Sequence, residues 1–404
     1  MRLFVHDYSG HPFQVQLSRW LAGQGHDVLH VYSSDVETPR GQLTSAPGDP
    51  GSFRVEPLST GRPLPKYDLV RRRFQERAFG RKLAARAREF RPDAVISSNA
   101  PVDVQDGLQT DLRRSGIPFV FWVQDIYSLA IRHYLKRKLP GVGGLVAAIY
   151  RRLEFRLIRN SDAVVVISDD FKDILVRESV PADKVTVIEN WAPLKDLPVM
   201  PRDNAWSREQ GLEGKFVFLY AGTLGLKHDP TLLADLARRY ADRDDVAVVV
   251  VSQGLGRKLL EEVKRDEGLK NLRLLDFQPF ERMPEVLGTG DVVIAILEPE
   301  ASVLSVPSKV LTYLTTGRPI LSVMPSENLA ARVIAGASAG KLVPPGDRAA
   351  FVEAAEALRG DKEGARSLGE AGRAYAERTF DIDVIGARFV DVIEQACAAR
   401  RATA

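Results

Sequence analysis

Short apolar runs rich in β-branched residues alternate along this chain with longer stretches of helical periodicity, and this alternation limits the fold more than any other feature. Strand–helix–strand order is typical of βαβ units, which form parallel sheets covered by helices. The first half contains the runs RLFV, VLHVY, DAVIS, PFVFWV, DAVVVIS and VTVI. The second half repeats the scheme with FVFLYA, VAVVVVS, LRLL, DVVIAI, PILSV and KLV. The sequence therefore predicts an α/β protein with two similar parallel sheets.

The length of 404 residues also favours two domains, because one hydrophobic core rarely serves so long a chain. The segment ENWAPLKDLPVMPRDNAW, residues 189–206, has three prolines and little periodicity, which is typical of a linker. We expect one domain over residues 1–195 and a second over residues 205–380. A helix over residues 382–400 follows the second sheet and is expected to pack back on the first domain.

Composition excludes several classes of protein. Apolar residues make up 45% and charged residues 27%, which is globular composition. The single cysteine, Cys397, excludes an internal disulfide, and no Cys/His cluster has metal-ligand spacing. The run GVGGLVAAIY, residues 141–150, is half of the roughly 20 residues that a membrane-spanning helix needs. The N-terminus MRLFVHDYSGHPF turns polar after a short strand-like run, unlike the longer apolar core of a signal peptide. We therefore expect a cytoplasmic protein, and one without a metal or other cofactor.

Basic residues are concentrated in two stretches, although the net charge is only +3. Residues 66–91 contain ten Lys or Arg, and residues 132–159 contain eight. Both stretches mix these residues with Leu, Phe and Tyr at spacings that allow amphipathic helices. Such helices can lie on an anionic membrane surface, here the inner face of the cell membrane, or receive a phosphorylated lipid-linked acceptor. A solvated helix face and nucleic-acid binding are the alternatives, and we favour the membrane surface because both stretches lie in one half of the chain.

Ligands of open parallel sheets bind beyond the carboxyl ends of the strands, so the turns that follow strands are the places to search. In the first domain, the turn HDYSGHPF offers Ser9, Gly10 and His11. The strand FVFWV ends in Gln124 and Asp125, whose carboxylate could accept a hydroxyl proton or hydrogen-bond a sugar. An ordinary capped turn is the alternative at both places.

In the second domain, the turn LYAGTLGLKHDP contains Gly222, Thr223, Gly225 and Lys227. Glycines let the backbone approach an anion closely, and a lysine supplies a compact charge that suits phosphate. The turn VSQGLGRKLL, which contains Gln253, has two glycines at a strand exit but equally fits a plain turn.

The segment SVPSKVLTYLTTGRPIL places Ser308 and Lys309 in the first turn of an expected helix, after a proline that suits a helix start. Backbone N–H groups there would face a phosphate, and Lys309 would add a full charge. A capped helix with a solvated lysine is the alternative. Together with Lys227, this arrangement favours the pyrophosphate of a nucleotide.

Taken together, the motifs resemble those of family 4 glycosyltransferases, and the subgroup of bacterial fucosyl- and N-acetylhexosaminyl-transferases that build cell-surface polysaccharides in particular. The resemblance covers nearly the whole chain and rests on LAGQGHDVLHVY, FWVQDIYSLAI, DAVVVISDDF, VIENWAP, YAGTLGLKHDP, LLDFQPFERMPEVLGTGDVVIAIL, PSKVLTYLTTGRPIL and AGKLVPPGD, in this order.

The resemblance implies a GT-B fold, with two Rossmann-like domains facing across a cleft, and transfer that retains the anomeric configuration. The donor would be a UDP-, GDP- or dTDP-linked sugar on the second domain, and the acceptor a saccharide or lipid-linked saccharide on the first, with no metal required. Residues carried over by position and residues of the strand-end turns together give three expected sets: Gly222, Thr223, Leu224, Gly225, Lys227, Ser308 and Lys309 for the diphosphate; Gln253, Phe277, Gln278, Glu300 and Thr312 for the base and ribose; and Ser9, Gly10, His11, Gln124 and Asp125 for the sugar and acceptor.

The sequence departs from the family pattern at two points. The two glutamates usual in the family fall on Leu304 and Thr312, so Thr312 would contact the ribose and Glu298 or Glu300 would replace the first carboxylate. The histidine frequent after the acceptor-domain strand is represented by Gln124, beside Asp125.

The expected mechanism is front-face substitution. The leaving diphosphate accepts the proton of the acceptor, while Lys227 and Lys309 stabilise the growing charge and Asp125 orients a substrate. Two rivals remain at this stage. One is a nucleotide-sugar epimerase of the same fold, and the other is an inactive partner subunit that binds nucleotide sugars.

Overall fold

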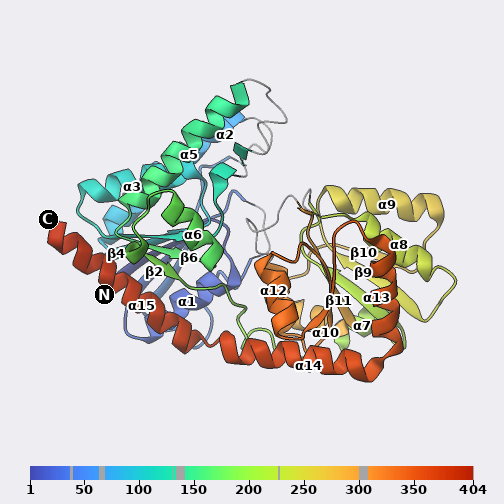
Figure 1. Cartoon of the computed structure of the whole chain (residues 1–404). Helices are drawn as coiled ribbons and strands as arrows, with labels where there is room; N and C mark the ends of the chain where they lie inside the picture. The colour runs from blue at the N-terminus through green and yellow to red at the C-terminus, as the bar shows by residue number, and fades with distance from the viewer. Residues whose placement is uncertain are drawn as a thin grey trace. The chain divides into compact units, whose positions relative to one another are not determined.

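The computed structural model describes residues 1–36, 40–62, 69–129, 131–132, 142–225, 228–299 and 308–403. The chain divides into two compact units, of which unit 1 comprises residues 1–189 and 382–404 and unit 2 comprises residues 190–381 (Figure 1). Unit 2 is therefore an insertion between the body of unit 1 and its last helix. Each unit is built on its own parallel sheet.

Unit 1 contains a seven-stranded sheet in the order β3-β2-β1-β4-β5-β6-β7, and all its strand pairs are parallel. Its strands are β1 (Arg2–Asp7), β2 (Asp27–Ser33), β3 (Phe53–Leu58), β4 (Ala94–Ser98), β5 (Phe119–Val123), β6 (Ala163–Val166) and β7 (Val185–Val187). Its helices are α1 (Pro12–Gly23), α2 (Leu69–Phe90), α3 (Val102–Arg114), α5 (Val142–Asn160), α6 (Asp169–Arg177) and α15 (Ile382–Thr403).

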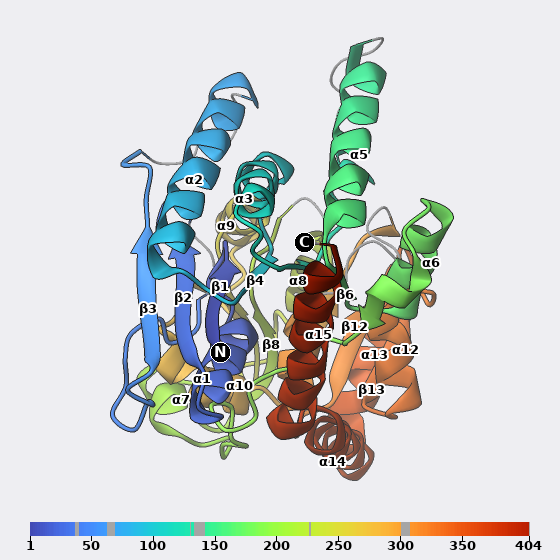
Figure 2. The same ribbon diagram turned by 90° about the vertical axis from the view of Figure 1, so that its left-hand side faces the viewer.

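Helices α2, α3 and α5 pack together on one face of this sheet, and α1 and α15 lie on the other. Helices α2 and α5 both run along the strand direction on either side of α3, and their first turns extend beyond the carboxyl edge of the sheet (Figure 2). The two basic stretches of the sequence therefore lie on the same face of unit 1, where the guanidinium of Arg73 lies 5.7 Å from the ring centroid of Tyr150. Residues 66–68 and 133–141 lie outside the described residues.

The last helix, α15, completes the core of unit 1. Phe389 is fully buried, and its ring centroid lies 4.6 Å from that of Trp122 on β5. Trp20 on α1 donates a hydrogen bond of 2.6 Å from Nε1 to Asp383. A Cβ at Gly386 would lie 2.3 Å from the Trp20 ring, so only glycine allows this close helix contact.

Unit 2 contains a six-stranded parallel sheet in the order β10-β9-β8-β11-β12-β13. Its strands are β8 (Phe216–Ala221), β9 (Val246–Val251), β10 (Leu272–Leu275), β11 (Val292–Ile296), β12 (Ile320–Val323) and β13 (Gly340–Val343). Its helices are α7 (Ala205–Glu209), α8 (Thr231–Arg239), α9 (Leu255–Glu267), α10 (Met283–Thr289), α11 (Ser308–Leu314), α12 (Leu329–Gly336), α13 (Arg348–Gly360) and α14 (Lys362–Thr379). β8, β9 and β11 are buried almost throughout, as expected for central parallel strands.

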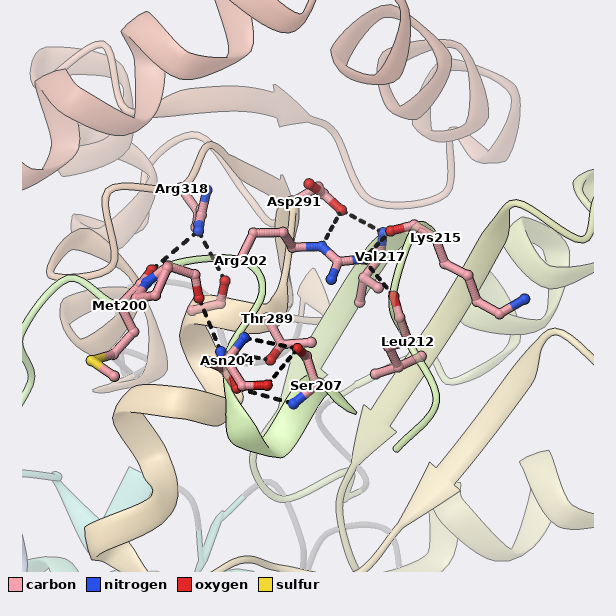
Figure 3. Close-up of polar contacts among 12 residues, drawn as sticks. Met200, Arg202, Asn204, Ser207, Leu212, Lys215, Val217, Thr289, Asp291 and Arg318 are labelled. Atoms are coloured by element: carbon pink, nitrogen blue, oxygen red, sulfur yellow. Dashed lines mark hydrogen bonds and ion pairs between the residues drawn. The ribbon is translucent and has the colours of Figure 1, made fainter. Parts of the chain in front are cut away.

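A polar network fixes the segment that precedes β8 to the body of unit 2 (Figure 3). The guanidinium of Arg202 lies 3.0 Å from the carboxylate of Asp291, which also accepts the backbone N–H of Val217 at 2.7 Å. Asn204 caps α7 and donates to two backbone carbonyls at 3.0 Å. Arg318, from the Gly-Arg-Pro after α11, donates to two more carbonyls at 3.2 and 2.9 Å. This motif therefore holds the linker against unit 2.

Each strand predicted from the sequence is confirmed, and β3 was missed. Two parallel-sheet Rossmann-like units confirm the predicted fold class. Among the described helices, none is both long and apolar enough to cross a bilayer.

Candidate functional site

The strand order predicts one ligand-binding position at each sheet. In unit 2 the chain leaves β8 toward β9 on one side and later returns to β11 on the other, so the strand order reverses between β8 and β11. In unit 1 the same reversal lies between β1 and β4. Ligands of open α/β sheets bind at such switch points. The turns after β8 and β1, both singled out from the sequence, are at these positions.

The turn after β8 is held mainly by its own backbone. The N–H of Gly222 donates to the carbonyl of Val251 at 3.0 Å, and that of Leu224 donates to the carbonyl of Gln253 at 3.2 Å. The N–H of Gly225 donates to Nδ1 of His228 at 3.1 Å. These three N–H groups therefore already have acceptors within the protein.

The side chains of this turn differ in exposure, and the backbone of Gly222 is unusual. Thr223 is exposed, whereas the side chain of Leu224 is fully buried and packs in the core. The backbone of Gly222 has a φ of +133°, a conformation that L side chains rarely adopt. A Cβ there would lie 3.4 Å from Cε of Lys309, so the glycine also makes room for the lysine.

Lys309 lies over this turn, and helix α11 begins at Ser308 as the sequence predicts. Its ammonium lies 3.9 Å from the ring centroid of Tyr220 and donates to the phenol oxygen. Burial lowers the pKa of Lys309 to about 7. Within the described residues, no carboxylate forms an ion pair with this lysine. The site thus contains an amine whose charge an anionic ligand would stabilise.

Tyr313 holds the end of β8. Its hydroxyl accepts the N–H of Ala221 at 2.9 Å and donates to the carbonyl of the same residue at 3.0 Å. Lys309 and Tyr313 are four residues apart on α11 and therefore share one helix face. The sequence analysis missed both Tyr313 and Tyr220, although the spacing on α11 and the position of Tyr220 near a strand end were available signals.

The residues expected to contact the base and ribose lie around the ends of neighbouring strands. Gln253 follows β9 and is exposed, and Phe277 and Gln278 follow β10 and are half-buried. Nε1 of the buried Trp206 donates to Oε1 of Gln278 at 3.1 Å and so orients its amide. Thr312 is half-buried on α11, one residue before Tyr313.

Three positions of the expected donor site lie outside the described residues: Lys227, Glu300 and Leu304. Glu298 lies within them and is half-buried.

In unit 1, Asp7 organises the turn after β1. Its buried carboxylate accepts the backbone N–H of Ser9 at 3.1 Å and that of His11. These contacts with His11 hold the pKa of Asp7 below its usual value, against the effect of burial. Nδ1 of His11 also lies 2.9 Å from Nδ2 of Asn99, which follows β4, so the hydrogen bond spans the switch point. The sequence analysis missed Asp7, although it carries the same strand-end signal as Asp125.

The turn after β5 is held from α5. Glu154 accepts the N–H of Tyr127 at 2.8 Å and that of Ser128 at 2.9 Å. Burial, with a smaller contribution from the nearby Asp125, raises the pKa of Glu154 to about 7. Gln124 is buried and Asp125 half-buried at the start of this turn. Glu154 is therefore a further residue that the sequence analysis missed, and it fixes the backbone next to Asp125.

Many basic residues of α2 and α5 are paired with acidic residues of unit 1. Arg73 and Arg77 lie 3.3 and 3.1 Å from the buried Asp103 of α3, and Arg156 lies 2.7 Å from Asp106. Apolar side chains on the first turns of the two helices are exposed instead. These are Val70 and Phe74 on α2, 67% and 70% exposed, and Leu145 and Ile149 on α5, 65% and 50% exposed.

Comparisons with known proteins identify both units. Residues 11–191 match the model of the glycosyl transferase 4-like domain, and residues 215–361 match that of the glycosyl transferases group 1. The chain is a glycosyltransferase of the GT-B type. This confirms the resemblance to family 4 glycosyltransferases stated from the sequence motifs.

A relative and two solved structures agree with this assignment. The glycosyltransferase is 24% identical over 315 residues to an Escherichia coli K12 protein named as the colanic acid biosynthesis glycosyl transferase WcaI, covering 75% of this chain and 76% of that one. The Anabaena protein HepE, solved with UDP and glucose, superposes with a TM-score of 0.72 at 16% identity over 98% of this chain and 99% of that one. Sucrose-phosphate synthase of Thermosynechococcus elongatus gives 0.73 at 16% identity over 99% and 100%. At this identity, the two structures support the fold alone.

Proposed function

We propose that this glycosyltransferase moves a sugar from a nucleotide-diphosphate sugar to a saccharide acceptor in the synthesis of a cell-surface polysaccharide or glycoconjugate. The observation that carries the proposal is Lys309, an amine held over the glycine turn at the switch point of unit 2. Its charge is destabilised by burial, and the diphosphate of a donor would supply the missing negative charge. The UDP in the HepE structure and the name of the E. coli relative support the same assignment.

The proposed step retains the anomeric configuration. The bond from the anomeric carbon to the leaving phosphate oxygen breaks, and the bond to the acceptor oxygen forms on the same face of the sugar. The acceptor hydroxyl gives its proton to the leaving diphosphate, so no nucleophile from the protein is required. Lys309, together with Lys227 from the turn after β8, stabilises the charge that develops on the diphosphate. Asp125 orients the acceptor or the transferred sugar, on a turn that Glu154 holds.

A donor screen tests this proposal. Purified protein is incubated with UDP-, GDP- and dTDP-linked sugars, with and without lipid-linked saccharides, and release of the nucleoside diphosphate is followed. We expect release that depends on one donor and on an acceptor, and a retained anomeric configuration by NMR of the product. Release of a free sugar epimer without any acceptor would instead support an epimerase, and nucleotide binding without turnover would support an inactive partner subunit.

We further propose that the first turns of α2 and α5 contact the inner face of the cell membrane, where a lipid-linked acceptor would be presented. The support is the exposed apolar set of Val70, Phe74, Leu145 and Ile149, flanked by arginines, on helix ends that extend beyond the carboxyl edge of the sheet (Figure 2). At such surfaces, apolar side chains insert between the lipid headgroups, and basic residues attract anionic lipids.

Vesicle co-sedimentation tests the membrane contact. The protein should bind vesicles of phosphatidylglycerol and phosphatidylethanolamine, and the Phe74→Ser, Ile149→Ser variant should bind several-fold less. Val384→Ser, an exposed apolar residue of α15 in the same unit, is the matched control and should leave binding unchanged. Equal binding by all three proteins would exclude this surface as the membrane contact.

A further inference from the structure

Two buried tyrosines of unit 2, Tyr220 and Tyr313, join the glycine turn to Lys309, and neither belongs to the donor site expected from the sequence. Both side chains lie in the core, with 0% and 1% of their surface exposed. A buried phenol normally needs a hydrogen-bond partner, and each of these two bonds to backbone at the end of β8.

Tyr313 replaces a missing strand contact. The ladder between β8 and β9 continues to Ala221, but β11 pairs with β8 only at Phe218 and Leu219. On the β11 side the backbone of Ala221 therefore needs another partner, and the Tyr313 hydroxyl both accepts from its N–H and donates to its carbonyl. This pair of bonds fixes the peptide plane that leads into Gly222 and its unusual φ.

Tyr220 holds the lysine. Its ring lies under the ammonium of Lys309, its oxygen accepts a hydrogen bond from that ammonium, and its hydroxyl donates to the carbonyl of Thr223 at 2.9 Å. The lysine, the phenol and the turn thus form one chain of contacts. A tyrosine orients the amine without a negative charge, whereas a carboxylate in its place would neutralise the amine and repel an anionic ligand.

We propose that Tyr220 and Tyr313 are positioning residues for the donor diphosphate. Tyr220 aims Lys309 across the glycine turn and leaves its charge to be matched by the ligand, and Tyr313 sets the direction of the turn itself. The proposal rests on the proposed function, because it takes the diphosphate as the ligand of Lys309.

The test is a double-mutant cycle on ligand binding. Isothermal titration calorimetry measures the affinity of the full-length protein for UDP, GDP, dTDP and inorganic pyrophosphate. Y220F and Y313F, which keep the rings and lose the hydroxyls, should each bind the preferred nucleotide about tenfold more weakly. K309M should bind about 10- to 100-fold more weakly. If Tyr220 acts through the lysine, adding Y220F to K309M should change affinity less than about twofold.

Y240F is the matched control. Tyr240 is also buried in the core of unit 2, and its hydroxyl has no hydrogen-bond partner among the described residues. This variant should bind nucleotide as tightly as the wild type. That result would show that loss of a buried tyrosine hydroxyl does not by itself weaken binding.

Different outcomes would contradict the positioning role and the proposed function. Wild-type affinity in Y220F, or losses that multiply in the double variant, would overturn the positioning role while leaving the proposed function intact. If the wild type binds none of the four probes, the proposed function fails and the inference falls with it. Near-ultraviolet circular dichroism checks folding, and if Y313F does not fold, the cycle between Tyr220 and Lys309 decides the proposal alone.

Discussion

Replacing Lys309 by methionine should stabilise this glycosyltransferase while it weakens donor binding. Burial lowers the pKa of the lysine from 10.5 to about 7, so the charged amine is less stable in the folded protein than in the unfolded chain. Each pH unit between the two values corresponds to about 1.4 kcal/mol, which sets an upper bound of roughly 5 kcal/mol. The side chain is partly exposed, and its contact with the Tyr220 ring is worth about 1 kcal/mol. We therefore expect K309M to be more stable by about 1–3 kcal/mol near neutral pH.

The pH dependence of this difference is the sharper test. Below pH 7 both the folded and the unfolded wild type carry the proton, and the penalty is complete. Between about pH 7 and 10.5 the folded lysine loses its proton while the unfolded one keeps it, so the wild type gains stability relative to K309M. The advantage of K309M should therefore shrink steadily as the pH rises through this range.

Urea unfolding of both proteins between pH 6.5 and 10 measures the effect, read from the transition of unit 2. Lys258→Met on α9, which removes an exposed lysine, is the matched control and should shift stability by less than about 0.5 kcal/mol at every pH. A K309M protein that is less stable than the wild type at pH 6.5, or an advantage that does not change with pH, would refute the reasoning.

Three further predictions concern unit 1. Burial lowers the pKa of His6 to about 3 and that of His30 to about 4, so below pH 6.5 only the unfolded chain binds these protons. Stability should then fall by about 1.4 kcal/mol per histidine for each pH unit down to about pH 4, and urea unfolding of H6Q/H30Q should show a flatter profile than the wild type. G386A should lower the thermal midpoint of unit 1, with a loss of about 1–3 kcal/mol, because its methyl group collides with Trp20; an unchanged midpoint would contradict the contact. E154A should lower kcat by a larger factor than it changes the KM for the donor, because two backbone N–H groups beside Asp125 lose their acceptor. A change in the donor KM alone would contradict this role.

The sequence was sufficient to predict the two sheets because central parallel strands are buried on both faces. Runs such as VAVVVV and FVFLYA follow from that burial and can be recognised without any tertiary information. The missed strand β3, with the sequence FRVEPL, is an edge strand that alternates Arg54 and Glu56 with apolar residues and contains Pro57. Charges and proline are common at sheet edges and weaken the strand signal.

The site was predictable only in part, because local patterns reveal turns but not the side chains that support them. The helix start at Ser308 and the glycine turn after β8 were found from short motifs. The bonds from Tyr313 to Ala221 join residues 92 positions apart, and the contact of Lys309 with Tyr220 joins residues 89 apart. Such pairs become neighbours only when α11 packs against β8, so the spacing on α11 and the strand-end position of Tyr220 could suggest these residues but not their contacts. Glu154 was missed for the same reason, because its contacts with Tyr127 and Ser128 depend on the packing of α5.

The insertion of unit 2 before α15 sets an order for folding during synthesis. Unit 2 is continuous in the chain and can complete its sheet as soon as residue 381 has left the ribosome. Unit 1 is translated first, but it still lacks the helix that covers Trp122 and Trp20 until after its neighbour has emerged. Part of the apolar face of the unit 1 sheet therefore remains exposed until α15 has been synthesised. A nascent chain arrested before residue 382 should therefore expose that face to chaperones. Burial of this face by α15 would then be the last step in folding of unit 1.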